Sequence, residues 1–282
     1  MTTADMTDVR QAAAFSEGGA GGNPAGALIG DSLPSDAKLQ AIAGAAGYSD
    51  TALAAPEGVH WRVRYLTPDC EVDFCGHATI TVGAVMTELN GPGIYPLQIN
   101  AGGICVAGRL DDARQSQIEL SSPPAHIGPV DAAPLEKALA LFGLRGDDLD
   151  PQIPPETANA GNDHLVLALR HRVRLAAIVY DLEAGRLLME QHGLTIINLI
   201  WAEDRRQIHS RNSFSISGVP EDPAIEAAAA FAGYLRDLGW SYTASIEVTQ
   251  GADMGMSSKP RDTIPDEADA PVLVSGTTRT IE

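Results

Sequence analysis

Residues 65–86, YLTPDCEVDFCGHATITVGAVM, join a strand-like run to a helix that is rich in small residues. Gly76 lets the backbone turn sharply where this helix begins. The first N–H groups of a helix have no intrahelical partner, and together they give its N-terminus about half a positive charge. The stretch therefore predicts an anion-binding turn with His77 beside the ligand. A plainer interpretation stays open, in which Cys75 is a small buried residue and His77 only caps the turn.

Composition excludes several classes of partner. The chain has 282 residues and a formal net charge of -18, so it is expected to repel nucleic acid and anionic membrane surfaces. The three cysteines, at positions 70, 75 and 105, have no zinc-binding spacing and cannot all pair, which fits a reduced, cytoplasmic protein. No leader-like segment and no long apolar run is found, so we expect neither export nor a membrane span.

The pattern of apolar residues predicts a mixed α+β fold. Expected strands are 60–66, 97–99, 104–110, 164–169, 176–180, 195–200 and 245–250. Expected helices, several opened by a capping residue or a proline, are 35–46, 78–89, 134–142, 183–191 and 222–238. Residues 145–163 are rich in Pro, Asp and Gly and are expected to form a long surface connection. Residues 254–265 are expected to form a loop.

Two segments share one design, CGHATITVGAVMTEL and GVPEDPAIEAAAAFAGYL. In each, a strand-like run ends in a Gly-containing turn that opens an Ala-rich helix, and small side chains allow strands to wrap closely around such a helix. We therefore expect two similar halves, residues 1–115 with 265–282 and residues 116–264. Facing helix N-termini would form a shared anion site between the halves. The alternative is a coincidence in an Ala-rich chain.

Several motifs together resemble those of the phenazine-biosynthesis-like (PhzF-like) isomerases, in order and spacing from about residue 15 to residue 280. They are Asn23-Pro24-Ala25-Gly26, Gly47-Tyr48-Ser49-Asp50-Thr51-Ala52, Arg64-Tyr65-Leu66-Thr67-Pro68, Cys75-Gly76-His77-Ala78-Thr79, Gly218 with Glu221-Asp222-Pro223, and Gln250-Gly251. The resemblance implies a diaminopimelate-epimerase-like fold. In that fold each half is a mostly antiparallel curved sheet around a central helix, and the active site lies between the halves. It also implies no metal, no cofactor and a homodimer.

The chain departs from the family pattern at two places. The family's acid–base residue is usually Glu, and the matching position here is Asp50, which keeps the carboxylate on a side chain one carbon shorter. The second motif usually continues Thr-Gly-Ser, whereas this chain has Ile225, Glu226 and Ala227. The usual binding pose of the substrate is therefore not expected to carry over unchanged.

The chemistry can be argued from the residues themselves. One carboxylate can move a proton between two carbons of an activated substrate, and we assign this task to Asp50. The N–H groups of Gly76, His77 and Ala78 would hold the negative charge that develops. His77 would orient the ligand or relay a proton, and Asp222 would bind an amine or hydroxyl group. As alternatives, each of the two aspartates could be an ordinary turn or cap residue.

Other residues are weaker candidates. Asn23 could donate to a substrate carboxylate, although Asn-Pro is also an ordinary turn. Cys75 is placed like the first of the two cysteines that exchange the α-proton in related epimerases, but no cysteine lies near Ala227 to supply the second, which favours a packing role. Arg64 and Arg211 could pair with a carboxylate, but arginines in so acidic a chain are usually surface partners. A histidine that begins a strand, His164, is expected to be structural.

Three functions follow as hypotheses. The first is a cofactor-free isomerase that moves a proton, and hence a double bond, in a small cyclic carboxylate of specialised biosynthesis. An unsaturated pyrroline acid of an alkylproline antibiotic pathway is one such substrate. The second is an amino-acid racemase or epimerase that uses Asp50 with His77 or Cys75 as the opposite base. The third is a non-catalytic ligand-binding homologue, suggested by the changed second motif.

Overall fold

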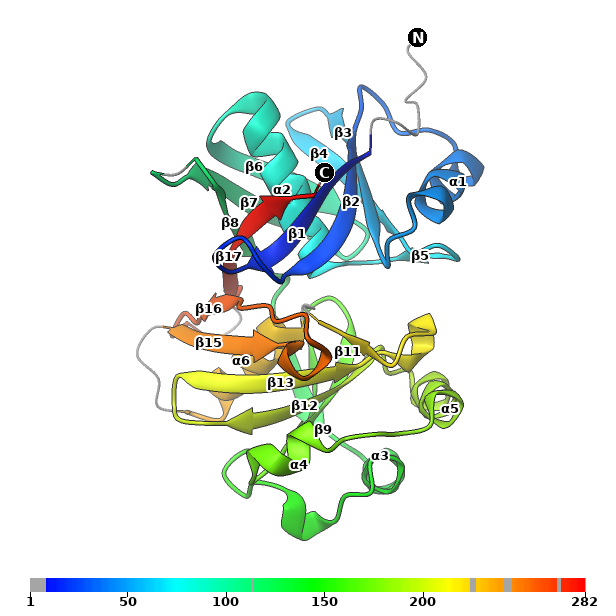
Figure 1. Ribbon diagram of the computed structural model, residues 1–282, viewed down its shortest axis with the longest axis vertical. Coiled ribbons are helices and arrows are strands. Elements are labelled where there is room, and N and C mark those ends of the chain that lie inside the picture. The colour runs from blue at the N-terminus through cyan, green and yellow to red at the C-terminus, as the bar shows by residue number, and fades with distance from the viewer. Residues whose placement is uncertain (1–8, 113, 224–226, 241–244, 268–269, 282) are drawn as a thin grey trace. The chain divides into compact units, whose positions relative to one another are not determined.

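The computed structural model describes residues 9–112, 114–223, 227–240, 245–267 and 270–281 (Figure 1). The chain forms two compact units, unit 1 (Met1–Pro123 with Leu273–Glu282) and unit 2 (Pro124–Val272). The boundaries expected after residues 115 and 264 lie before these points. The difference arises because strand β8 (Ser116–Ser121) pairs with two strands of unit 1 and therefore belongs to its sheet.

The sheet of unit 1 closes on itself. Its long strands pair in the order β1–β2–β3–β4–β6–β7–β8–β17 and return to β1, and only β2–β3 and β4–β6 are parallel. The strands not yet given are β1 (Arg10–Ser16), β2 (Asn23–Ile29), β3 (Thr51–Glu57), β4 (His60–Leu66), β6 (Gly93–Ile99), β7 (Gly102–Leu110) and β17 (Leu273–Thr280), with the short β5 (Glu71–Val72) on β4. Closure leaves no free edge on these eight strands.

Helix α2 (Gly76–Asn90) fills this barrel. Every residue from Gly76 to Thr87 is buried, and the helix contacts strands from all around the ring, among them β1, β2, β7 and β8. Such burial on all sides is possible because the helix is built from glycine, alanine, threonine and β-branched residues. The second helix of the unit, α1 (Asp36–Ala46), packs Leu39 and Ile42 against the strands from outside.

Gly83 is the point of closest approach between α2 and the sheet. A Cβ atom added there would lie 2.8 Å from Ile118 Cγ2 and closer still to Val106, and both of these side chains are buried. We expect Gly83→Ala to lower the free energy of unfolding by about 1–3 kcal/mol, because overpacking forces shifts in a filled core.

Urea denaturation of the purified protein measures this effect. Gly44→Ala is the matched control, since Gly44 lies inside helix α1 and an added Cβ there would meet only Pro68 O at 3.6 Å. The control should be neutral or stabilising by up to about 1 kcal/mol, as alanine favours a helix over glycine. Equal losses in the two variants would contradict close packing at Gly83.

Unit 2 likewise consists of one sheet and a buried helix, with further helices outside. Its strands pair in the order β9–β10–β11–β12–β13–β15–β16, with the short β14 on β13. They are β9 (His126–Pro129), β10 (Glu156–Asn159), β11 (Asp163–Ala168), β12 (Ile196–Ala202), β13 (Gln207–Ser213), β14 (Glu221–Asp222), β15 (Ser245–Gln250) and β16 (Arg261–Thr263). Helix α6 (Ala227–Asp237) is buried from Ala227 to Leu235. Helices α3 (Ala132–Leu141), α4 (Arg172–Ala176) and α5 (Leu182–His192) complete the unit, and an outer core joins them to β11 and β12.

The two units repeat one order of elements. Each has two antiparallel strands, a helical connection, a third strand parallel to the second, and a fourth antiparallel to the third. A two-residue strand then leads to the buried helix, and the next strand is parallel to the fourth. This confirms the expected α+β fold of two similar halves, each a mostly antiparallel sheet around a helix.

Four local expectations are wrong. Residues 176–180 are not a strand: Ala176 ends helix α4, and the apolar residues after it bury Ile178 in the outer core. Residues 145–163 include β10 and the fully buried Ile153, so this range is not only a surface connection and part of it belongs to the sheet. Residues 254–265 include β16. The helix expected over 222–238 does not begin at Asp222, which lies in β14, and residues 224–226 lie outside the described residues.

Within the described residues, no helix is both long and apolar enough to cross a membrane.

Candidate active site

The first turn of α2 is held by hydrogen bonds from its own side chains and from β4. Cys75 is the N-cap residue, and the Thr79 hydroxyl donates to its carbonyl oxygen at 2.6 Å. The Tyr65 hydroxyl, from β4, lies 2.6 Å from the same threonine hydroxyl. Because all these groups are buried, the position of the helix N-terminus is fixed by packing as well as by hydrogen bonds.

Three of the sequence-predicted residues meet at this turn. Asp50 immediately precedes β3, and its Oδ2 lies 3.5 Å from His77 Nε2. Cys75 Sγ lies 3.4 Å from His77 Nδ1 and 4.0 Å from His77 Nε2. The Asp50 side chain is 5% exposed and the His77 side chain is fully buried. We call Asp50, Cys75 and His77 the acid–base cluster.

Burial decides the charge of the histidine. It lowers the pKa of His77 below its usual value, and the neighbouring Asp50 carboxylate offsets this only in part. The imidazole is therefore neutral at neutral pH, so its contact with Asp50 is not an ion pair. A neutral imidazole in contact with a carboxylate and a thiol can donate one hydrogen bond and accept another.

The remaining candidates of unit 1 lie nearby in the fold. Ala78 and His77 belong to the first turn of α2, where backbone N–H groups have no intrahelical partner, and Gly76 opens the helix. Asn23 is buried and begins β2, the parallel neighbour of β3. The backbone N–H of Gly26 in β2 donates to the Asp50 carbonyl at 3.1 Å, so Asn23 and Asp50 lie at the same end of neighbouring strands.

The internal repeat shows which position of unit 2 corresponds to Asp50. Leu66 pairs with Glu71 across β4 and β5, and Ser213 pairs with Glu221 across β13 and β14. One strand further on, Thr51 pairs with Leu66, and Ile197 pairs with Ser213. Thr51 therefore corresponds to Ile197, and the preceding residue, Asp50, corresponds to Ile196.

Counting from the two short strands gives the partner of His77. Glu71 precedes His77 by the same number of residues by which Glu221 precedes Ala227. Ile196 and Ala227 form a buried apolar cluster with Phe214. The position of the acid–base pair in unit 1 is thus taken by an apolar contact in unit 2, so the chemistry of this repeated position belongs to unit 1.

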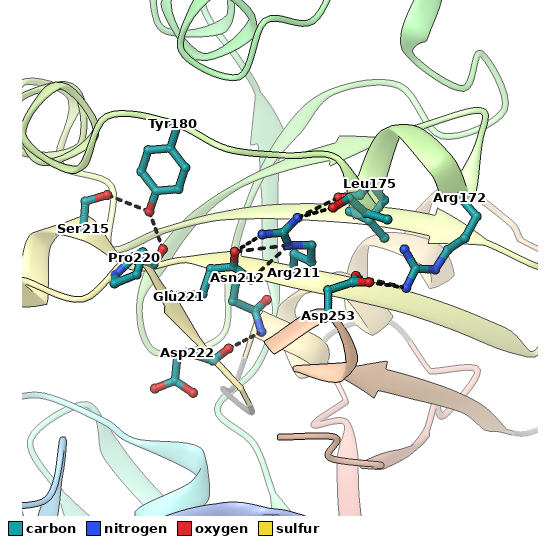
Figure 2. Close-up of polar contacts among 11 residues, drawn as sticks. Arg172, Leu175, Tyr180, Arg211, Asn212, Ser215, Pro220, Glu221, Asp222 and Asp253 are labelled. Atoms are coloured by element: carbon teal, nitrogen blue, oxygen red, sulfur yellow. Dashed lines mark hydrogen bonds and ion pairs between the residues drawn. The ribbon is translucent and has the colours of Figure 1, made fainter. Parts of the chain in front are cut away.

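In unit 2, Asp222 is buried at the end of β14 beside a polar network (Figure 2). The Asn212 side-chain amide donates to the Asp222 carbonyl at 3.3 Å and to Gln250 Oε1 at 3.2 Å. Asn198 in turn donates to Asn212 Oδ1 at 2.7 Å. In Figure 2 the Asp222 carboxylate points away from Asn212, and the bond from Asn212 holds the backbone of Asp222.

This network was not predicted from the sequence. Its members Ser210 and Asn212 are two residues apart on β13, so they lie on one face of the sheet, and both are buried. Asn198 Nδ2 also donates to the Ser210 hydroxyl at 2.7 Å. Six of the seven residues of β13 are polar, including the alternate positions 210 and 212, and this is the signal that could have indicated a polar inner face.

Arg64 and Arg211 occupy equivalent positions and make equivalent contacts. Arg64 Nε donates to Glu71 at 2.8 Å, and its guanidinium also binds Asp36. Arg211 Nε donates to both Glu221 oxygens at 3.0 and 3.1 Å, and this pair is almost fully buried (Figure 2). In each unit the arginine pairs with a glutamate of the short strand and so links this strand to its neighbour. Both guanidinium groups are therefore already paired within the protein, which disfavours a role in binding a substrate carboxylate.

His164 is buried on β11, in agreement with the structural role expected for it. Its side chain is fully buried and neither ring nitrogen has a hydrogen-bond partner. Burial lowers the pKa of His164 to about 4. At neutral pH the residue is therefore neutral and packs in the core as an apolar group would.

Replacing His164 with leucine is expected to remove the fall in the free energy of unfolding that the wild type undergoes below pH of about 6.5. Below pH of about 6.5 the unfolded histidine takes up a proton, whereas the folded one does so only near pH 4, so folding loses up to about 3 kcal/mol over this window. His164→Leu removes that loss. Urea denaturation at pH 8, 6 and 5 measures it, with the exposed His126→Leu as control. A parallel pH profile for wild type and His164→Leu would refute the assignment.

A family model described as phenazine biosynthesis-like protein, PhzC-PhzF, matches residues 12–282. Among similar proteins, "Uncharacterized isomerase YddE" of Escherichia coli strain K12 is 30% identical over 177 residues, which cover 61% of this chain and 59% of YddE. The chain thus matches less than two thirds of the length of YddE. "Uncharacterized isomerase YfhB" of Bacillus subtilis strain 168 is 27% identical over 257 residues, or 87% of this chain and 86% of YfhB.

Solved structures share the fold. A phenazine biosynthesis protein of the PhzF family from Bacillus anthracis superimposes with a TM-score of 0.80 at 21% identity, covering 97% of this chain and 96% of that one. A probable proline racemase from Agrobacterium radiobacter K84 gives a TM-score of 0.67 at 13% identity, covering 97% and 90%. At these identities the likeness concerns the fold alone.

Proposed function

Because the chain belongs to the phenazine biosynthesis-like (PhzC-PhzF) family, we propose that it is a cofactor-independent isomerase that moves a proton, and with it a double bond, within a small cyclic carboxylate. The observation that carries the proposal is the acid–base cluster. Asp50 places a carboxylate against a neutral histidine in a buried site, at a position whose counterpart in unit 2 is apolar. We assign the base to the Asp50 carboxylate, and one base suffices for a proton shift.

The proposed reaction has two steps at Asp50. The carboxylate first takes a proton from one carbon of the substrate, and the electron pair of that C–H bond moves into the conjugated system. The resulting carboxylic acid then returns the proton to a second carbon, so the double bond has moved and Asp50 is a carboxylate again. The N–H groups of the first turn of α2, those of His77 and Ala78 among them, stabilise the charge of the intermediate.

Racemisation by two bases within this cluster is less well supported. Bases that act on opposite faces of one carbon must each approach it to about 3–3.5 Å, so they lie about 6–7 Å apart. The ligand atoms of Asp50, Cys75 and His77 all lie within 4.8 Å of one another. Asp50 and Cys75 therefore share one side of a bound substrate. This geometry favours a one-base shift over stereoinversion.

The finer predictions concern the substrate and its surroundings. An unsaturated pyrroline acid of an alkylproline-type antibiotic pathway has the carboxylate and the acidified C–H bond that the site requires. Asn23 is proposed to bind the substrate carboxylate, and Asp222 an amine or hydroxyl group. A homodimer and a cytoplasmic location are further predictions, which follow from the family resemblance and from the composition.

Proton exchange in deuterated buffer tests the proposal. The protein is incubated with a panel of unsaturated pyrroline and cyclohexadiene carboxylates and followed by NMR. We expect deuterium at a new carbon together with a shifted double bond. Deuterium at the α-carbon with loss of chirality and no shift would show a racemase instead. A carboxylate that binds without any exchange would show a non-catalytic protein, and either of these two results would overturn the proposal.

A further inference from the structure

The three side chains of the acid–base cluster are also of the types that bind metal ions. Its three side chains offer one thiol sulfur, one imidazole nitrogen and one carboxylate oxygen, all buried and all within 4.8 Å of one another. Among the described residues, this is the one group of three or more such side chains that meets a metal-binding arrangement. Thiolate, imidazole and carboxylate are the ligands that Zn²⁺ uses in proteins.

The distances nearly match those of a zinc site. Bonds of about 2.3 Å to sulfur and about 2.0–2.2 Å to nitrogen and oxygen place two tetrahedral ligands about 3.4–3.6 Å apart. His77 Nε2 lies 3.5 Å from Asp50 Oδ2 and 4.0 Å from Cys75 Sγ. Cys75 Sγ lies nearer to the other ring nitrogen, at 3.4 Å from His77 Nδ1, so the Cys75 side chain must turn towards Nε2 before all three atoms can bond to one ion.

We propose that the acid–base cluster binds one Zn²⁺ ion through Asp50, Cys75 and His77, and that the ion switches the protein off. Binding forms three bonds to the metal, and the Cys75 thiol releases its proton to solvent. Three protein ligands leave the fourth position of the ion open to a water molecule or a carboxylate. The metal site stands on the three side chains alone, whereas the inhibition rests on the proposed function.

The inhibition has a direct cause. An Asp50 oxygen that is bonded to Zn²⁺ has lost the lone pair and the charge with which it would take a proton from carbon. Zinc therefore competes with the reaction, in contrast to enzymes in which the metal activates the substrate or a water molecule.

Spectroscopic titration without substrate tests the site. Co²⁺ replaces Zn²⁺ as the probe, because a cobalt–thiolate bond gives a charge-transfer band and intense d–d bands in tetrahedral coordination. We expect one equivalent to bind, to show the thiolate band, and to be displaced by Zn²⁺. Cys75→Ser should abolish that band and weaken Zn²⁺ binding, measured against a chromogenic chelator, by more than the 10–100-fold typical for loss of an outer-shell partner.

The chain supplies a matched control in its two exposed cysteines. The Cys70→Ser/Cys105→Ser double variant should bind cobalt as the wild type does. Loss of the band in this variant and its survival in Cys75→Ser would overturn the proposal, as would absence of stoichiometric binding to the wild type. If Cys75→Ser does not fold by circular dichroism, His77→Gln provides the same comparison. Loss of stoichiometric binding in His77→Gln supports the site, and unchanged binding contradicts it.

A separate measurement distinguishes the two proposals. In the deuterium exchange experiment, Zn²⁺ should stop exchange by the wild type and a chelator should restore it. Stoichiometric zinc binding to a protein that shows no exchange when metal-free would leave the site intact and refute the isomerase. Exchange that continues with one equivalent of Zn²⁺ bound would refute the inhibition alone.

Discussion

Replacing Asp50 with asparagine is expected to slow deuterium exchange into the substrate by about a hundredfold to ten-thousandfold, the range typical for loss of a general acid–base group. Asparagine has nearly the same shape, so the contact with His77 at 3.5 Å can be kept while the proton acceptor is lost. Substrate binding should change far less than the rate. The measurement is the exchange rate by NMR at saturating substrate, with the dissociation constant determined separately by calorimetry.

Asp50→Glu is the informative partner variant. It restores a carboxylate, with the side-chain length that is usual in the family the chain resembles, and it should recover part of the rate that Asp50→Asn loses. Recovery would show that the carboxylate, and not the shape of residue 50, carries the reaction. An asparagine variant that exchanges at the wild-type rate would contradict the role of Asp50 and place the base elsewhere.

Replacing Asp262 with asparagine is expected to stabilise the protein at neutral pH by about 4 kcal/mol. This aspartate lies in β16, is fully buried, and neither of its carboxylate oxygens has a hydrogen-bond partner. Burial raises the pKa of Asp262 to about 8, from 3.8 in an unperturbed carboxyl group. Between these two pH values the unfolded chain loses the proton that the folded chain keeps, so folding becomes less favourable by about 1.4 kcal/mol per pH unit.

The pH dependence makes this prediction specific. The stability difference between wild type and Asp262→Asn should be smallest near pH 4, close to the unfolded pKa of 3.8, and it should grow up to about pH 8. Guanidinium denaturation at pH 4, 6 and 8 measures the difference. Asp266→Asn, four residues further on and exposed, should show no such divergence. A constant difference at all three pH values would mean that Asp262 does not act through its charge.

The sequence predicted best the features that only one kind of residue can form. The turn at Gly76 and the small-residue helix after it were predictable, because only such a helix can be buried on all sides. The chemistry assigned to Asp50 and His77 required both residues at one ligand, and the structure shows them in contact at 3.5 Å. The packing role expected for Cys75 is incomplete, since its sulfur also contacts the histidine.

Much of the barrel could not be predicted, because its strands lack the usual signals. The central residues of β1, AAA, and of β3, ALAA, are alanine-rich and have weak strand propensity, yet they are buried in the barrel. They are strands because small side chains allow them to pack closely around α2. The strand β16 and the burial of its aspartate were likewise not predictable, because a short polar segment between prolines usually indicates a loop.

The pairing of β17 with both β1 and β8 has a consequence for the order in which the protein is made. A ribosome completes the whole of unit 2 before it reaches β17, which closes the barrel of unit 1. Until β17 is made, the nascent first unit therefore has unpaired edges on β1 and β8, and unpaired strand edges promote aggregation. Unit 2, continuous in sequence, can fold while still tethered, and β17 then follows it directly in the chain.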